Sequence, residues 1–99
     1  MVVLNQAKRL ELLEKLVAIP SVNDHEQAVA QFLHIYLAKY GISSQLVQVA
    51  PDRACLVAKV GTGTPCLALA GHLDVVAATA SAWQSDPFVL TERNKKLYG

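Results

Sequence analysis

A histidine and an aspartate separated by a single residue carry the clearest chemical signal in this chain of 99 residues. His72 and Asp74 follow Gly71, which ends an apolar run at residues 66–70. Side chains of an extended backbone alternate between faces, so an extended chain through Leu73 would point His72 and Asp74 the same way. A neutral imidazole binds a divalent metal through one ring nitrogen, and it is held best when the other nitrogen donates to a carboxylate. The spacing therefore suggests His72 as a metal ligand and Asp74 as the group that orients it.

The same spacing also occurs in histidines that are only hydrogen-bonded at a strand end, so the pair alone leaves both interpretations open. Its position favours function, because functional residues in open α/β sheets lie just beyond the carboxyl ends of strands. A catalytic zinc site needs about three protein ligands, and His72 is the one credible ligand here. His25 and His34 are expected to be solvated. Catalysis by a serine nucleophile is not expected, because no serine has a histidine partner at a recognisable spacing.

The composition points to part of a larger protein. Hydrophobic residues make up 53% of the chain and charged residues 17%, below the ~25% charged residues of typical soluble domains. Such a chain can build a core but has few polar residues to cover it, which favours a fragment that the rest of a protein covers. Cys55 and Cys66 are too far apart for a Cys-x-x-Cys site and are expected to be free, mostly buried thiols.

Charge and hydropathy exclude several classes of partner. The net charge is +1 without a basic cluster, so a nucleic-acid partner is not expected. No apolar run approaches the ~20 residues of a membrane-spanning helix, so no membrane partner is expected either. The N-terminus turns polar and basic after a few residues, the reverse of a secretory signal, which predicts a cytoplasmic protein.

Periodicity predicts an α/β fold in which two helices are followed by strands of a mixed sheet. The first helix spans about 5–18 and ends before Pro20. The second is expected to start at an N-cap, Asn23, and to end near Tyr40 with Gly41 in the left-handed conformation. The expected strands cover 44–49, 54–60 and 66–70, the last a central strand covered on both faces, and a hairpin covers 87–98 with its turn at 93–95.

Four segments, in order along the chain, resemble one known family. The segment Gly71-His72-Leu73-Asp74-Val75-Val76 resembles the first metal motif of the zinc-dependent aminoacylase and carboxypeptidase family of metallopeptidases, of the acetylornithine deacetylase and succinyl-diaminopimelate desuccinylase type. The other three matching segments are Leu16-Val17-Ala18-Ile19-Pro20-Ser21-Val22, Trp83-Gln84-Ser85-Asp86-Pro87-Phe88 and Lys96-Leu97-Tyr98-Gly99. The resemblance thus extends over nearly the whole chain.

The resemblance implies that residues 1–99 are the N-terminal portion of a zinc-peptidase-like catalytic domain. His72 would bind one of two zinc ions, for which cobalt or manganese could substitute, and Asp74 would be the catalytic-site carboxylate that orients His72. The family's remaining acidic ligands, its general-base glutamate and a late histidine would follow Gly99. A lid domain outside residues 1–99 would hold two copies of the protein together as a homodimer. The whole protein would hydrolyse an N-acyl amino acid or short peptide, as desuccinylases and deacetylases of amino-acid biosynthesis do, whereas residues 1–99 alone would be inactive.

Two alternatives remain open at this point. One is a dipeptidase or carboxypeptidase of the same family, because later residues set the specificity. The other is a small, non-catalytic α/β binding module in which His72 and Asp74 are structural. A reading frame that continues past Gly99 into Arg-Gly-x-x-Asp would favour the enzyme, and a natural stop codon there would favour the module.

Overall fold

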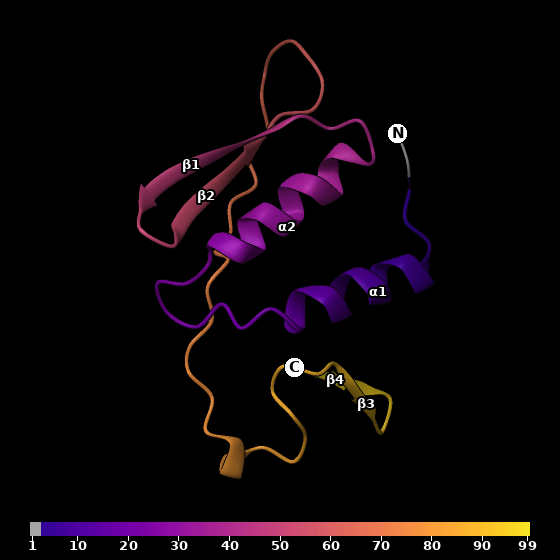
Figure 1. The fold of residues 1–99 in the computed structure, drawn as a ribbon. Coiled ribbons are helices and arrows are strands. Elements are labelled where there is room, and N and C mark those ends of the chain that lie inside the picture. Colours follow the sequence, from indigo (N-terminus) through magenta and orange to yellow (C-terminus); the bar gives the residue numbers. More distant parts are fainter. Residues whose placement is uncertain (1–2) are drawn as a thin grey trace.

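A computed structural model describes residues 3–99 and shows an α/β arrangement (Figure 1). The chain forms, in order, α1 (Gln6–Val17), α2 (Gln27–Ala38), β1 (Ser44–Ala50), β2 (Arg53–Ala58), a 3-10 turn η1 (Ala80–Ala82), β3 (Thr91–Arg93) and β4 (Lys96–Tyr98). The predicted order of two helices followed by strands is confirmed. Neither helix in the described part of the chain has the length and apolar character to cross a membrane.

The first helix forms where its apolar periodicity predicts it. The Asn5 side chain caps it, because its Oδ1 accepts a hydrogen bond from the Lys8 backbone N–H at 2.9 Å. Leu16 and Val17, in the last turn, are half-buried, whereas Leu13 is 40% exposed. Leu12 is half-buried as well, so the side of α1 that carries Leu12, Leu16 and Val17 is the part that packs against the rest of the chain.

The second helix starts later than the sequence predicts. Asn23 is not its N-cap, since α2 begins at Gln27, and Asn23 has a positive φ of 21°. Tertiary contacts explain the difference. The Asn23 backbone N–H donates to Val75 O at 3.0 Å. The carboxylate of Glu26, three residues later, accepts from Arg53 Nε at 3.2 Å, so the two residues do not form the reciprocal contacts of a capping box. The predicted stop is confirmed, because Gly41 has a φ of 72°.

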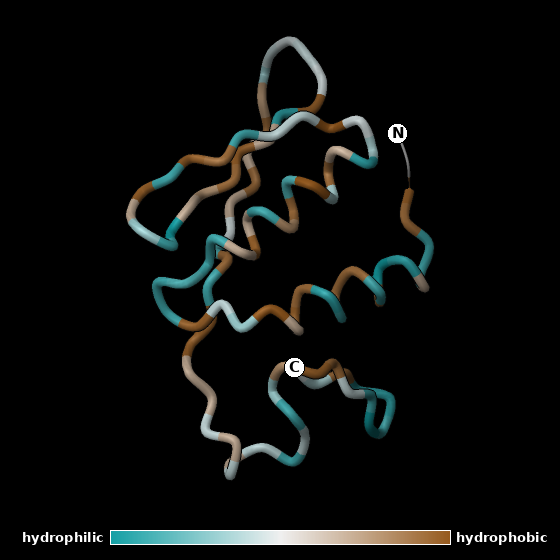
Figure 2. Tube along the Cα trace, viewed as in Figure 1, coloured by the Kyte–Doolittle hydropathy of each residue, from teal (hydrophilic) through white to brown (hydrophobic). Residues whose placement is uncertain are grey.

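The strands form two separate antiparallel pairs. In the first, β1 pairs with β2, with Leu46 opposite Leu56, and α2 packs against both strands. The small core lies between them, where Ala30 is 0% and Ala54 2% exposed. Figure 2 shows hydrophobic residues along α2 and along the β1–β2 hairpin. In the second pair, β3 and β4 form the predicted C-terminal hairpin. Both residues of its two-residue turn, Asn94 and Lys95, have positive φ values, as in type I′ hairpin turns.

The predicted central strand at 66–70 is wrong for this chain. No residue of that run is paired in a strand, and Leu67 and Leu69 are 85% and 91% exposed. A strand exists only through hydrogen bonds to a neighbouring strand, and no segment within residues 3–99 pairs with this run. Cys55 and Cys66 are free thiols, as predicted. The prediction that they are mostly buried is wrong, because both are exposed.

Candidate functional site

The segment that carries His72 and Asp74 is held beside the chain between the two helices. Val22 and Val75 form an isolated parallel bridge. Around it, the Val75 N–H donates to Ser21 O and the Asn23 N–H donates to Val75 O, both at 3.0 Å. The turn after α1 thus fixes the backbone of the motif from a distance of about fifty residues in sequence.

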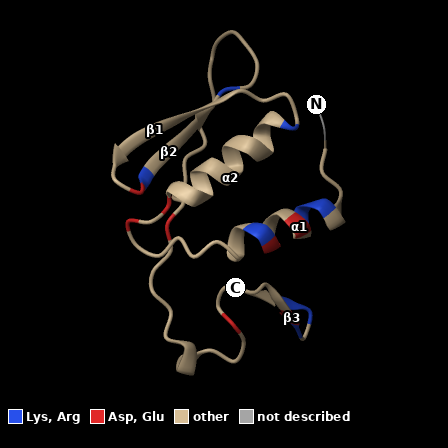
Figure 3. Ribbon diagram, viewed as in Figure 1, with Lys and Arg blue, Asp and Glu red and all other residues tan. Residues whose placement is uncertain are grey.

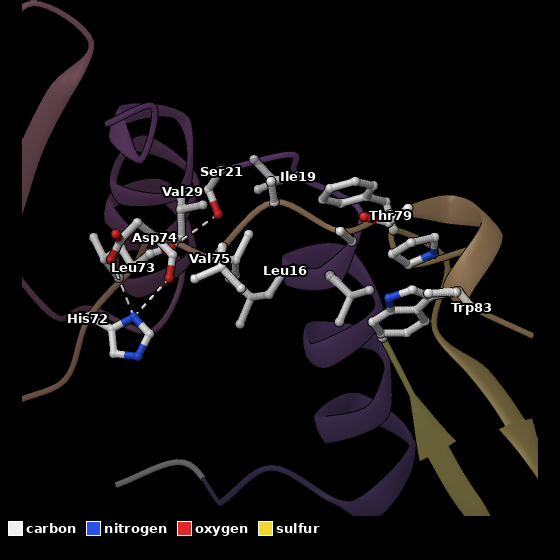
Figure 4. A pocket seen from close by; sticks show the side chains of 18 of the residues that line it. Leu16, Ile19, Ser21, Val29, His72, Leu73, Asp74, Val75, Thr79 and Trp83 are labelled. Atoms are coloured by element: carbon white, nitrogen blue, oxygen red, sulfur yellow. Dashed lines mark hydrogen bonds and ion pairs between the residues drawn. The ribbon is translucent and has the colours of Figure 1, made fainter. Parts of the chain in front are cut away.

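The structure brings His72 and Asp74 together, as their spacing predicts. The His72 Nδ1 atom lies 2.8 Å from the Asp74 backbone oxygen and 3.3 Å from the Asp74 Oδ1 atom. A carbonyl oxygen can only accept, so the contact assigns the imidazole proton to Nδ1 and leaves the lone pair of a neutral ring on Nε2. In Figure 4 the Nε2 side of the ring points away from both Asp74 oxygens. The shorter contact goes to the backbone rather than to the carboxylate, which the sequence did not predict.

The His72 ring is open to its surroundings. Its side chain is 83% exposed and that of Asp74 is 40% exposed. Both residues line two hollows, with volumes of about 570 Å³ and 450 Å³. The ring is therefore presented at an accessible edge, while the half-buried Leu73 between them anchors the segment.

The larger hollow collects residues from all four segments that carry the family resemblance. Its walls are mainly apolar (Figure 4), and they include Leu16, Val17, Ile19, Ser21, Leu73, Val75, Trp83, Pro87, Phe88 and Gly99. Segments that are scattered in sequence thus line one hollow, with His72 and Asp74 at one end of it and Trp83 at the other (Figure 4).

A charged cluster forms one wall of the smaller hollow. Arg53, at the start of β2, lies 3.2 Å from Glu26 Oε1 and 3.1 Å from Asp24 Oδ1. Glu26 is buried at 8% exposure, so the pair fastens the β1–β2 hairpin to the start of α2. Charges gather at this junction, on α1 and on β3–β4, as Figure 3 shows. The contacts of Arg53 join segments that are distant in sequence, so no local pattern pointed to them.

The other two histidines lie outside both hollows. His25 is exposed, as predicted, and its Nδ1 contacts the Asp52 carboxylate. His34 is half-buried rather than solvated, because its Nδ1 lies 2.7 Å from the Ser44 hydroxyl and ties α2 to β1. Within residues 3–99 no three histidine, cysteine or acidic side chains are grouped to hold a metal ion. Of the three histidines, His72 alone lines the hollows beside the motif.

Comparison with curated proteins gives relatives along the whole chain. A protein named probable succinyl-diaminopimelate desuccinylase from Staphylococcus epidermidis is 43% identical over 100 aligned positions, which cover 100% of this chain and 25% of the relative. Its namesake from Staphylococcus aureus is 39% identical with the same coverage. The acetylornithine deacetylase of Vibrio cholerae is 37% identical over 98 positions, 91% of this chain and 26% of that protein. No family model matches the chain.

The chain thus belongs with proteins of the deacetylase and desuccinylase type, as its motifs indicate. More particularly, it is homologous to the N-terminal quarter of proteins named succinyl-diaminopimelate desuccinylase and acetylornithine deacetylase. It spans about a quarter of the length of these relatives.

Proposed function

We propose that this chain is the N-terminal portion of the catalytic domain of a metal-dependent amidohydrolase. Its reaction would be hydrolysis of the amide bond of an N-acyl amino acid. The names of the relatives support two substrates, N-succinyl-diaminopimelate and N-acetylornithine. The exposed apolar run at 66–70 speaks against a self-contained binding module, because a small domain gains little by leaving such a run uncovered.

One observation carries the proposal. The His72 Nδ1–H donates to the Asp74 backbone oxygen and lies 3.3 Å from Asp74 Oδ1, while the His72 side chain is exposed beside two hollows. Protein histidines that bind metals commonly donate their second N–H to a carboxylate or a backbone carbonyl, which fixes the tautomer and the direction of the ligating nitrogen. The Asp74 backbone oxygen is such an acceptor here, and the Asp74 carboxylate lies 3.3 Å from the same nitrogen.

The donor present fits zinc, which takes imidazole nitrogen as a ligand. His72 Nε2 would be this chain's contribution, and the remaining ligands and the general base would come from elsewhere in the protein, because zinc catalysis needs about three protein ligands. Bound there, zinc supplies Lewis-acid polarisation of the amide carbonyl and lowers the pKa of water. Cobalt and manganese could substitute for zinc. We also propose that the whole protein is a cytoplasmic homodimer formed through a lid domain.

The work of this chain's own residues is to hold the ligand. The Asp74 backbone oxygen accepts a hydrogen bond from Nδ1–H and so keeps the Nε2 lone pair available. The Asp74 carboxylate also places a negative charge near an imidazole that would share electron density with a cation. The turn after α1 keeps the extended backbone in the conformation that puts both side chains on the same side.

The proposal is tested by assaying the whole protein on N-succinyl-diaminopimelate and on N-acetylornithine. We expect hydrolysis of one of them, loss of activity after chelation, and recovery with added zinc, cobalt or manganese. A polypeptide of residues 1–99 serves as the control and should be inactive, because it supplies one credible ligand.

Three outcomes would change the account. Hydrolysis that persists after complete removal of metal would contradict metal dependence. Chelator-sensitive hydrolysis by residues 1–99 alone would contradict the proposal that the other ligands and the general base lie outside these residues. Cleavage of dipeptides, with both N-acyl amino acids left intact, would replace the deacylase by the dipeptidase or carboxypeptidase alternative.

A further inference from the structure

We infer that Ser21 is a positioning residue for the His72–Asp74 pair, an inference that rests on the proposed metal-binding role of His72. Ser21 is 3% exposed. Its hydroxyl donates to the Leu73 backbone oxygen at 3.1 Å, across 52 positions of sequence. Leu73 is the residue between the candidate ligand and the carboxylate that orients it.

Ser21 holds both peptide groups that flank Asp74. Its hydroxyl binds the oxygen of the peptide between Leu73 and Asp74, and its backbone oxygen accepts the N–H of the next peptide, that of Val75, at 3.0 Å. Each peptide group is planar, so a hydrogen bond to one atom fixes the whole plane. The two contacts together set the direction in which the Asp74 side chain leaves the backbone.

The second of these peptide groups also contacts the imidazole. Its oxygen, Asp74 O, accepts from His72 Nδ1, while its N–H donates to Ser21 O. A continuous set of hydrogen bonds therefore runs from Ser21 to the His72 ring. Figure 4 shows the Ser21 hydroxyl directed at the motif from the opposite side of the backbone to the imidazole.

The hydroxyl is the part of this arrangement that a substitution can remove selectively. Any residue at position 21 keeps the backbone oxygen, but alanine loses the donor to Leu73 O. The Leu73 carbonyl would then be free to tilt, and with it the Cα–Cβ direction of Asp74. Because the distance and angle of a ligand decide how well it holds a metal, looser positioning should appear first in metal affinity.

Ser44 offers a matched control. Its hydroxyl is also part-buried and hydrogen-bonded, at 2.7 Å from His34 Nδ1, but it joins α2 to β1 rather than contacting the motif. Ser21→Thr supplies the rescue, since it keeps a hydroxyl and its extra methyl can project into the larger hollow that Ser21 lines. The two variants separate a loss of positioning from a loss of stability.

The experiment measures the zinc dissociation constant of the whole protein by competition with a chromogenic chelator, together with kcat, KM and Tm. For Ser21→Ala we expect zinc binding to weaken several-fold, up to about 10-fold, the lower limit for outer partners of metal ligands. At subsaturating zinc kcat should fall in parallel while KM is unchanged. Ser21→Thr should recover most of the affinity, and Ser44→Ala should lower Tm without changing zinc binding.

The inference would be overturned if Ser21→Ala kept the zinc affinity and kcat of the wild type while its Tm fell as in Ser44→Ala. Ser21 would then stabilise the fold without positioning the motif. His72→Ala, measured alongside, separates the two proposals: unchanged zinc binding in that variant refutes the ligand role of His72 itself. If Ser21→Ala does not yield folded protein, Ser21→Val, which matches Ser21→Thr in shape but has no donor, takes its place with the same two outcomes.

Discussion

The whole protein carrying His72→Ala should lose the metal ion from one site and nearly all of its turnover. The substitution removes the imidazole whose Nε2 is exposed and directed away from Asp74. No second imidazole is at hand to replace it, because neither His25 nor His34 lines the hollows beside the motif. The loss of turnover should exceed the ~100-fold upper limit for residues that merely orient a ligand. Elemental analysis measures the loss of metal, and kcat on the N-acyl substrate measures the loss of turnover.

His25→Ala is the control for this prediction. His25 is an exposed histidine that also contacts a carboxylate, that of Asp52, but it lines neither hollow beside the motif. Its removal should leave metal content and kcat as in the wild type. Full metal content in His72→Ala, or equal losses in both variants, would show that His72 is not a ligand.

The Asp74 variants should lose part of the metal affinity and part of the activity, in a graded order. Asp74→Ala keeps the ligand but removes the carboxylate that lies 3.3 Å from Nδ1. Asp74→Asn keeps an oxygen acceptor but loses the negative charge. Metal content and kcat should rank wild type, Asp74→Asn, Asp74→Ala and His72→Ala, with Asp74→Ala weaker than wild type by ~10–100-fold.

The structure places the Asp74→Ala effect toward the lower part of that range. The shorter contact of Nδ1, at 2.8 Å, goes to the backbone oxygen of residue 74, which every substitution retains. The tautomer should therefore persist in Asp74→Ala, and what is lost is the negative charge and some restriction of the ring. Wild-type zinc content and turnover in both Asp74 variants would refute an orienting role for this carboxylate.

Local sequence patterns predicted the elements whose determinants are local. Both helices, the stop at Gly41, the strands β1 and β2 and the C-terminal hairpin follow from periodicity and turn residues, whereas the pairing of β1 with β2 is seen only in the structure. The start of α2 did not, because Asn23 makes its backbone hydrogen bond to Val75, about fifty residues away. The run at 66–70 has the composition of a central strand, yet composition cannot supply the strand that must pair with it.

The candidate site divides in the same way. The spacing of His72 and Asp74 predicted that they would lie together, because alternation along an extended backbone is a local property. The Ser21 hydroxyl and the ion pair between Glu26 and Arg53 are contacts between distant segments, and single-sequence patterns carry no signal for them. The order of the four motif segments was visible in the sequence, but their convergence on one hollow was not.

The most direct test of the account is to locate the metal in a crystal of the whole protein by anomalous diffraction at the zinc edge. The account predicts a zinc ion bonded to His72 Nε2 at ~2.0–2.1 Å, with Nδ1 still donating to Asp74. A zinc ion bonded through Nδ1, or zinc sites that do not include His72, would contradict it.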